Sequence, residues 1–242
     1  MGTRGRFEEG DNGICPKSYD GGYINGSYVR EAYQYIGKRQ AMPDEANFIA
    51  HTTNWLPLTV TVGGERFRMA RSAFSEYERV LDMRSATLTR TVLFETSAGE
   101  QTRLTFSRLV SYADRHTSAI RLTVEPLNHT SEIRVCASLD GRTGNGVYVK
   151  HEEAGEVLFS AADGGRADLL KKLPSTGQYF MTSCLLVPDV ECETDADAEA
   201  PFNPCVSATF TPVAGQSYRF DKLVTTHTSR DCGHPHGLVP KG

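Results

Sequence analysis

Residues that could carry out acid–base chemistry are few in this chain, and the first candidates are the adjacent carboxyl groups of Glu8 and Glu9. Neighbouring residues of a strand point to opposite faces, so these two carboxyls cannot easily flank one bond as an acid and a base. We expect them to be solvated or salt-bridged instead. The sequence contains no G-x-S-x-G nucleophile elbow, no P-loop and no H-E-x-x-H zinc motif. It therefore predicts no catalytic residue and no cofactor.

Possible metal ligands are concentrated in the tail, at Cys232, His234 and His236. Soft and borderline ligands this close together could bind a metal, but short tails of this kind are usually mobile, and we predict no metal site. The cysteines show no CxxC spacing and are few for the length of the chain, so neither a disulfide scaffold nor a zinc ribbon is indicated. We expect free thiols at all six positions: Cys15, Cys136, Cys184, Cys192, Cys205 and Cys232.

Aromatic side chains are the candidates for binding. Segment 1–45 is rich in Gly and Tyr, and aromatic residues beside glycines can form a flat platform for a sugar ring. They also fill gaps in cores covered by loops, and we favour this interpretation. Trp55, the only tryptophan, precedes Pro57 at the entrance to an expected strand, where it could stack on a ligand but more often anchors a core edge. Tyr23, Tyr28 and Trp55 are the candidate contacts for a carbohydrate or a partner protein.

The element around which the other segments are arranged is a β-hairpin between Thr87 and Tyr112. Its two arms, joined at Ser97-Ala98-Gly99, alternate apolar and polar residues with the two-residue period of a strand. Each arm therefore has one apolar face, which a second sheet would cover. Arg90 and Arg108 fall in these apolar rows. Because a buried guanidinium needs a partner, we expect both where the rows reach solvent.

The remaining segments predict further strands and no domain linker. Segment 1–45 is interpreted as irregular loop with short strands around Tyr23 and Ile24, segment 75–84 as a loop, and the acidic segment 189–204 as a solvated loop. Strands are expected at 58–62 (turning at Gly63-Gly64 into Phe67 and Met69), 118–126, 132–139, 147–151, 156–161, 177–187, 206–212 and 216–226. The pattern predicts an all-β fold, a large two-sheet antiparallel β-sandwich. We expect one domain at 1–231 and a tail at 232–242.

Composition argues against several classes of function. The net charge is -4 and the pI about 6.0, with Lys and Arg scattered along the chain, so nothing resembles the basic footprint of a nucleic-acid binder. No run approaches the roughly 18 apolar residues needed to cross a bilayer, so we expect no membrane association. The first residues lack the apolar core of a signal peptide, and we place the protein in the cytoplasm.

Seven stretches, taken together and in order, carry a family resemblance. They are GTRGRFEEG (2–10), YINGSY (23–28), NWLPLTVTVGGERF (54–67), YERVLDMRSATLTRTV (77–92), SRLVSYADRHTSAIR with VEPLN (107–128), SLDGR (138–142) and GQSYRFDKLVTTHTSRD (215–231). The chain resembles the N-terminal domain of the family 65 glycoside hydrolases, the group of maltose, trehalose and kojibiose phosphorylases and related hydrolases. The stretches span almost the whole chain.

This resemblance implies a large β-sandwich, sometimes called a supersandwich, which in full-length members precedes a linker helix and an (α/α)6 barrel carrying the catalytic glutamate of an inverting mechanism. None of that equipment maps onto this sequence, which we expect to lack the family's first strand and to stop just after the TSRD motif. We therefore expect a non-catalytic domain that serves carbohydrate binding, homodimer formation or support of a catalytic barrel. The alternative is a free-standing carbohydrate-binding module, and an autonomous hydrolase is the least favoured class.

Overall fold

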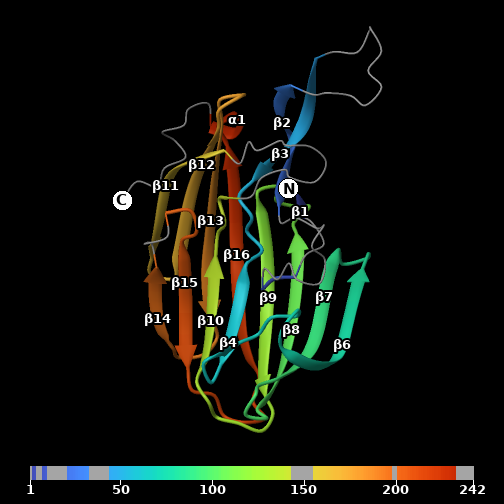
Figure 1. Ribbon diagram of the computed structural model, residues 1–242, viewed down its shortest axis with the longest axis vertical. Coiled ribbons are helices and arrows are strands. Elements are labelled where there is room, and N and C mark those ends of the chain that lie inside the picture. Colours follow the sequence, from blue (N-terminus) through green and yellow to red (C-terminus); the bar gives the residue numbers. More distant parts are fainter. Residues whose placement is uncertain are drawn as a thin grey trace.

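The regular structure of the protein is almost entirely antiparallel β-sheet, as the computed structural model in Figure 1 shows. It describes residues 2–3, 7–9, 21–32, 44–142, 155–197 and 201–232. The strands are β1 (Gly2–Thr3), β2 (Gly22–Ala32), β3 (Glu45–Thr52), β4 (Leu58–Val62), β5 (Glu65–Arg66), β6 (Ala73–Asp82), β7 (Thr87–Glu95), β8 (Gln101–Val110), β9 (Thr117–Pro126), β10 (Ile133–Ser138), β11 (Glu156–Asp163), β12 (Arg166–Leu173), β13 (Gln178–Pro188), β14 (Glu193–Asp197), β15 (Cys205–Phe210) and β16 (Tyr218–Thr228). Within the described residues, α1 (Ser229–Cys232) is the sole helix.

Two large sheets confirm the expected two-sheet β-sandwich. The first has eight strands in the order β11-β12-β13-β16-β9-β8-β7-β6, and the second has five in the order β14-β15-β10-β4-β5. A third, smaller sheet has the order β1-β2-β3. In the part of the chain that the structure describes, no helix is both long enough and apolar enough to span a membrane.

The expected hairpin is formed by β7 and β8, which pair along their whole length. Gly99 has a positive φ in the turn, and its N–H donates to the carbonyl of Thr96. Phe94 and Phe106 lie on the same face of the hairpin and are fully buried, as the alternation predicts. Tyr112 was expected on that face, but it follows the end of β8 and is fully exposed. Alternation holds only while the backbone remains in the sheet.

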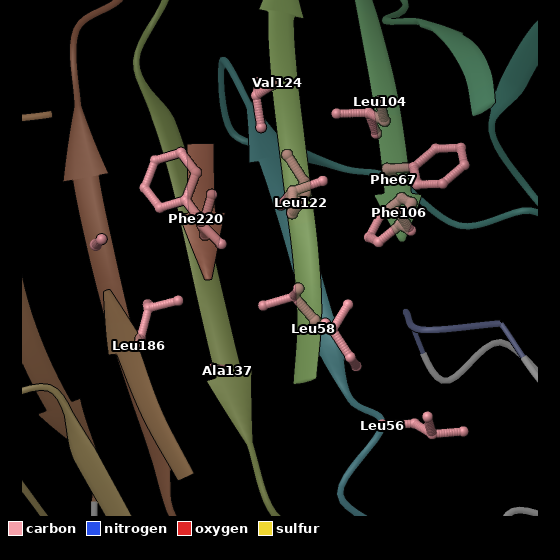
Figure 2. Packing of buried hydrophobic residues seen from close by; sticks show 14 of the residues in the cluster. Leu56, Leu58, Phe67, Leu104, Phe106, Leu122, Val124, Ala137, Leu186 and Phe220 are labelled. Atoms are coloured by element: carbon pink, nitrogen blue, oxygen red, sulfur yellow. The ribbon is translucent and has the colours of Figure 1, made fainter. Parts of the chain in front are cut away.

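The main core fills the space between the two large sheets. Figure 2 shows Leu58 of β4, Leu122 of β9 and Phe220 of β16 in this cluster, beside Phe67 and Phe106. Full burial of side chains of this size contributes roughly 1.5–3 kcal/mol each, so the cluster is the principal source of stability. Trp55 belongs to the same cluster and is 1% exposed, which agrees with its interpretation as a core anchor.

A second core cluster joins the small sheet to the end of the eight-stranded sheet. Val29 of β2 and Ala50 of β3 pack with Leu173 of β12 and Phe180 of β13. In Figure 1, β2, β3 and α1 lie together at the upper end of the molecule. This packing fixes the position of β2 relative to the end of β16 and to α1.

Several strands lie where the sequence predicted loops or gave little signal. β6 occupies most of segment 75–84 and β14 lies within 189–204, although both are exposed along their whole length. A strand with no buried face has no apolar alternation, so its pattern is that of a solvated loop. β2 is also longer than the short strand expected around Tyr23 and Ile24. The expected strand at 147–151 lies outside the described residues.

Arg90 and Arg108 are buried, which corrects the expectation that they reach solvent. Arg90 lies between the carboxylates of Glu8 and Glu9, with Nη2 2.9 Å from Glu8 Oε2 and Nη1 3.1 Å from Glu9 Oε1. Arg108 Nη1 is 3.2 Å from Glu8 Oε1. Glu8 and Glu9 are salt-bridged as expected, but they lie in a turn, so both carboxylates reach the same guanidinium. The Arg90 guanidinium also lies 4.4 Å from the ring centroid of Phe106.

A disulfide between Cys136 and Cys205 corrects the expectation of six free thiols. Antiparallel pairing of β10 with β15 brings the two Cα atoms to 6.5 Å, although the residues are 69 positions apart in sequence. Cys184 and Cys192 are free thiols. Cys15 and the tail beyond Cys232 lie outside the described residues. The missing CxxC spacing said nothing about this bond because strand pairing, not local spacing, brings the cysteines together.

Candidate functional site

A crevice opens where β2 meets the end of β16, the start of α1 and the turn before β9. It encloses about 340 Å³. Figure 1 places β2 and α1 at this end of the molecule. The crevice is lined by Ile24, Asn25 and Ser27 of β2, by Arg115 and His116 of the turn, by Thr226 and Thr228 of β16, and by Arg230 and Asp231 of α1.

The turn from Ser111 to Thr117 is held by the carboxylate of Asp114. This carboxylate accepts hydrogen bonds from the hydroxyl of Thr117 at 2.6 Å and from the backbone N–H of His116 at 3.0 Å. These hydrogen bonds hold the pKa of Asp114 below its ordinary value, and the one from Thr117 has the largest effect. Thr226 N–H donates to the carbonyl of His116, so the turn is fastened to β16.

Asp231 is positioned by a capping box at the start of α1. The hydroxyl of Thr228 accepts a hydrogen bond from the N–H of Arg230, while Asp231 Oδ2 reaches back to accept from the N–H of Thr228 at 2.7 Å. Burial disfavours the ionised carboxylate, but the hydrogen bonds from Thr228 and the nearby imidazoles of His116 and His227 outweigh it and lower the pKa of Asp231. The carboxylate is therefore ionised and fixed in orientation.

Two histidines meet beside this carboxylate. The ring of His116 stacks on that of His227, with centroids 4.3 Å apart and an interplanar angle of 16°. Nδ1 of His116 lies 3.0 Å from the carbonyl oxygen of Thr226. Because a carbonyl only accepts, Nδ1 carries the proton. Nε2 of His116 then has a free lone pair, and it faces Oδ1 of Asp231 at 3.9 Å.

A neighbouring hollow shares Arg230 with the crevice and encloses about 400 Å³. Tyr28, whose side chain is among the exposed large apolar groups, lines it together with Asn47, Ser175, Thr176 and Gln178. The guanidinium of Arg230 is anchored between the two spaces because its Nη1 donates to the carbonyl of Gly26 at 2.6 Å.

The structure does not bring the three aromatic candidates together at one surface. Tyr28 lines the hollow, and Tyr23 packs edge-on against His51 with ring centroids 4.8 Å apart. Trp55 lies in the main core. Only Tyr28 lines one of these two spaces with a largely exposed ring.

The described lining of the crevice is suited to holding a polar group. Cleavage by paired carboxyls needs an acid and a second carboxylate on opposite sides of the bond. Among the described lining residues, Asp231 is the only carboxylate, and its Oδ2 is occupied by Thr228. Arg115, Arg230 and Asn25 supply hydrogen-bond donors instead.

Sequence reasoning did not identify His116, His227 and Asp231. The local signals were present, since T-x-x-D at 228–231 is a capping box and D-x-x-T at 114–117 is a turn. The pairing of β9 with β16 is what brings the two histidines together, and no local motif predicts it.

Comparisons with known proteins agree on one family. A family model described as glycosyl hydrolase family 65, N-terminal domain, matches residues 1–239. An alpha,alpha-trehalose phosphorylase from Thermoanaerobacter brockii is 28% identical over 96% of this chain and 31% of its own length. A kojibiose phosphorylase from Caldanaerobacter subterraneus is 33% identical over 60% of this chain and 17% of its own. The chain thus spans less than a third of the length of these relatives.

A solved structure shows the same fold. The putative kojibiose phosphorylase from human microbiome superposes with a TM-score of 0.78 at 16% identity, covering 97% of this chain and 30% of that one. At this identity the similarity concerns the fold alone. The β-sandwich expected from the seven sequence stretches is therefore found both in this chain and in a relative.

Proposed function

The chain belongs to the family described as glycosyl hydrolase family 65, N-terminal domain, and we propose that it is the non-catalytic β-sandwich of a disaccharide phosphorylase or hydrolase. The observation that carries the proposal is the match of the N-terminal domain model to residues 1–239, nearly the whole chain. The trehalose phosphorylase relative is similar to this chain over 31% of its own length. We place the catalytic chemistry in the remainder of such an enzyme.

The proposed role is to support an (α/α)6 catalytic barrel and to contribute polar contacts beside it. The composition of the crevice supports this role, because its described lining has several donors but lacks the second carboxylate that glycoside cleavage requires. Anchored donors such as Arg230 are suited to orienting a sugar hydroxyl or a backbone carbonyl of the barrel.

The test is an activity assay on the purified chain with maltose, trehalose and kojibiose, each with and without phosphate. We expect neither glucose nor glucose 1-phosphate above a blank. The Asp231→Asn variant is the matched control, because it neutralises the only carboxylate of the described crevice lining. Turnover that copurifies with the chain and falls in Asp231→Asn would overturn the non-catalytic role.

A second candidate function, a carbohydrate-binding module, is favoured by Tyr28. Its exposed ring borders a hollow that also contains the amides of Asn47 and Gln178, a combination that suits a sugar ring. Isothermal titration with the same three disaccharides tests it. Binding that is lost in Tyr28→Ala but kept in Tyr112→Ala, an exposed tyrosine in the turn before β9, would support the module. Equal heats in both variants would exclude Tyr28 as the binding residue.

A further inference from the structure

We propose that His116, His227 and Asp231 form a binding site for a divalent transition-metal ion of the zinc type. The three residues come from the turn before β9, from β16 and from α1, and one possible ligand atom of each lies within 4.8 Å of the others. Two imidazoles and a carboxylate are a ligand set that zinc uses, and a water molecule completes the tetrahedron. The proposal is independent of any role in carbohydrate chemistry.

The orientation of His116 is that of a metal ligand held by an outer hydrogen bond. Its Nδ1–H donates a hydrogen bond to the carbonyl of Thr226 at 3.0 Å, which fixes the ring and leaves the lone pair of Nε2 available to a metal ion. That carbonyl belongs to the strand that also carries His227, so the two imidazoles are tied to one rigid element. In metal-binding histidines, the ring N–H that does not face the metal often donates a hydrogen bond to a backbone carbonyl in this way.

Asp231 is prepared in a similar way. The capping box engages its Oδ2 through the N–H and hydroxyl of Thr228, while Oδ1 faces Nε2 of His116. One carboxylate oxygen is thus used for structure, and the other points to the position where a cation would lie.

Metal binding requires a small closure of the cluster. Ligand atoms around tetrahedral zinc lie roughly 3.4 Å apart, since the metal–ligand bonds are about 2.0–2.2 Å. The two imidazole rings are stacked with their centroids 4.3 Å apart, so they must tilt before their nitrogen lone pairs can converge on one ion. His227 has room to tilt because its side chain projects from the exposed face of β16. The adjoining crevice of about 340 Å³ has room for the water ligand.

Positive charge at the site is the main opposing effect. Arg115 and Arg230 line the same crevice, and both would repel a cation. Arg230 is held by the carbonyl of Gly26, which fixes its Nη1 on β2. On the other side, the carboxylates of Asp114 and Asp231 both interact electrostatically with His116 and His227. A bound cation would take the place of the protons on these imidazoles, which bind metals in their neutral form, and the two carboxylates would offset the repulsion from the guanidiniums.

The experiment is titration of the full chain, freed of metal with EDTA, with zinc by isothermal calorimetry and with cobalt by visible absorption. We expect one zinc per chain and a cobalt spectrum of the intense, tetrahedral kind. His227→Gln and Asp231→Asn should each weaken zinc binding at least about 10–100-fold. Asp231→Asn keeps a carbonyl oxygen that can accept from Thr228, so the capping box survives. Thermal melts without metal establish that each variant is folded.

The tail provides the decisive control, because Cys232, His234 and His236 could bind zinc by themselves. A variant with Cys232→Ser, His234→Ala and His236→Ala should retain one-to-one binding and the cobalt spectrum. Loss of binding in this tail variant, with unchanged affinity in folded His227→Gln, would assign the metal to the tail and overturn the proposal. Absence of one-to-one zinc binding by the unaltered chain would overturn it as well.

Discussion

Four charged side chains are sealed into one end of the main core, where water cannot screen them. The carboxylates of Glu8 and Glu9 and the guanidiniums of Arg90 and Arg108 are almost completely buried. Taking such groups out of water costs several kcal/mol per ion, and their mutual attraction offsets this cost only while every partner is present. The cluster therefore specifies how the N-terminal turn docks on the hairpin more than it adds net stability.

Removing the central cation should be far more damaging than removing a half-buried one at the surface. We expect Arg90→Met to lower the free energy of unfolding by about 3–5 kcal/mol, because, among the described residues, Arg108 would be the only buried arginine left beside the two carboxylates. Arg103→Met on the neighbouring strand removes surface pairs with Glu125 and Glu76 and should cost less than ~1 kcal/mol. Urea denaturation of both variants makes the comparison. Similar denaturation midpoints for the two variants would mean that water reaches the cluster of Glu8, Glu9, Arg90 and Arg108.

Alternation of apolar and polar residues predicted the strands that have one buried face and missed those that have none. β7, β8 and β9 were predictable because each alternates between core and solvent. β6 was missed because every residue of it is exposed. The burial of Arg90 was missed because its partners, Glu8 and Glu9, lie in a turn far away in the sequence, which alternation within a strand does not reveal. The crevice was beyond prediction because three distant segments form it.

The exposed edge strand β6 predicts self-association. In the described residues, β6 pairs only with β7, so its other edge presents unpaired backbone groups. A bulge near Glu76 interrupts its first half, but pairing is regular from Glu78 to Asp82, where Val80 and Leu81 are exposed. We expect the chain to associate at micromolar concentration through this edge and Leu81→Lys to reduce the association.

Light scattering across a dilution series measures this effect. Leu109→Lys is the matched control, because Leu109 is an exposed leucine on β8, two strands away from the edge. If both variants lower the apparent mass equally, general hydrophobicity and not the edge drives the association. A chain that remains monomeric at all concentrations would contradict the prediction.

At the scale of the whole molecule, Lys222 links the two large sheets. It projects from β16 into the core, is fully buried, and its Nζ donates to the carbonyls of Ser138 at 2.7 Å and Pro57 at 2.8 Å in the opposite layer. Desolvation lowers the pKa of Lys222 from 10.5 to about 8. The family resemblance predicted the sandwich, but it did not predict that a lysine faces the core. The buried face of the strand that carries Lys222 was recognised only from its apolar residues.

This lysine should make stability rise at alkaline pH. Between about pH 8 and 10.5 the unfolded chain binds more protons than the folded chain, so the free energy of unfolding increases with pH in that window and the contribution is lost as pH falls through about 8. The shift corresponds to about 3 kcal/mol. Cys184 titrates nearby with the opposite sign, because burial raises its pKa. The measurement is therefore urea denaturation of Cys184→Ala with and without Lys222→Met. If the difference in the free energy of unfolding between these two proteins does not change with pH, the lowered pKa does not belong to Lys222.

The order of strands also bears on how the chain is made. β16 is the last strand of the described chain, yet it lies in the middle of the eight-stranded sheet, between β13 and β9. During synthesis from the N-terminus, β6 to β9 and β11 to β13 emerge as two separate blocks with no shared hydrogen-bonded edge. Both inner edges remain open until residues 218–228 leave the ribosome and close the gap. The nascent chain is therefore most exposed to mispairing at the moment just before β16 appears.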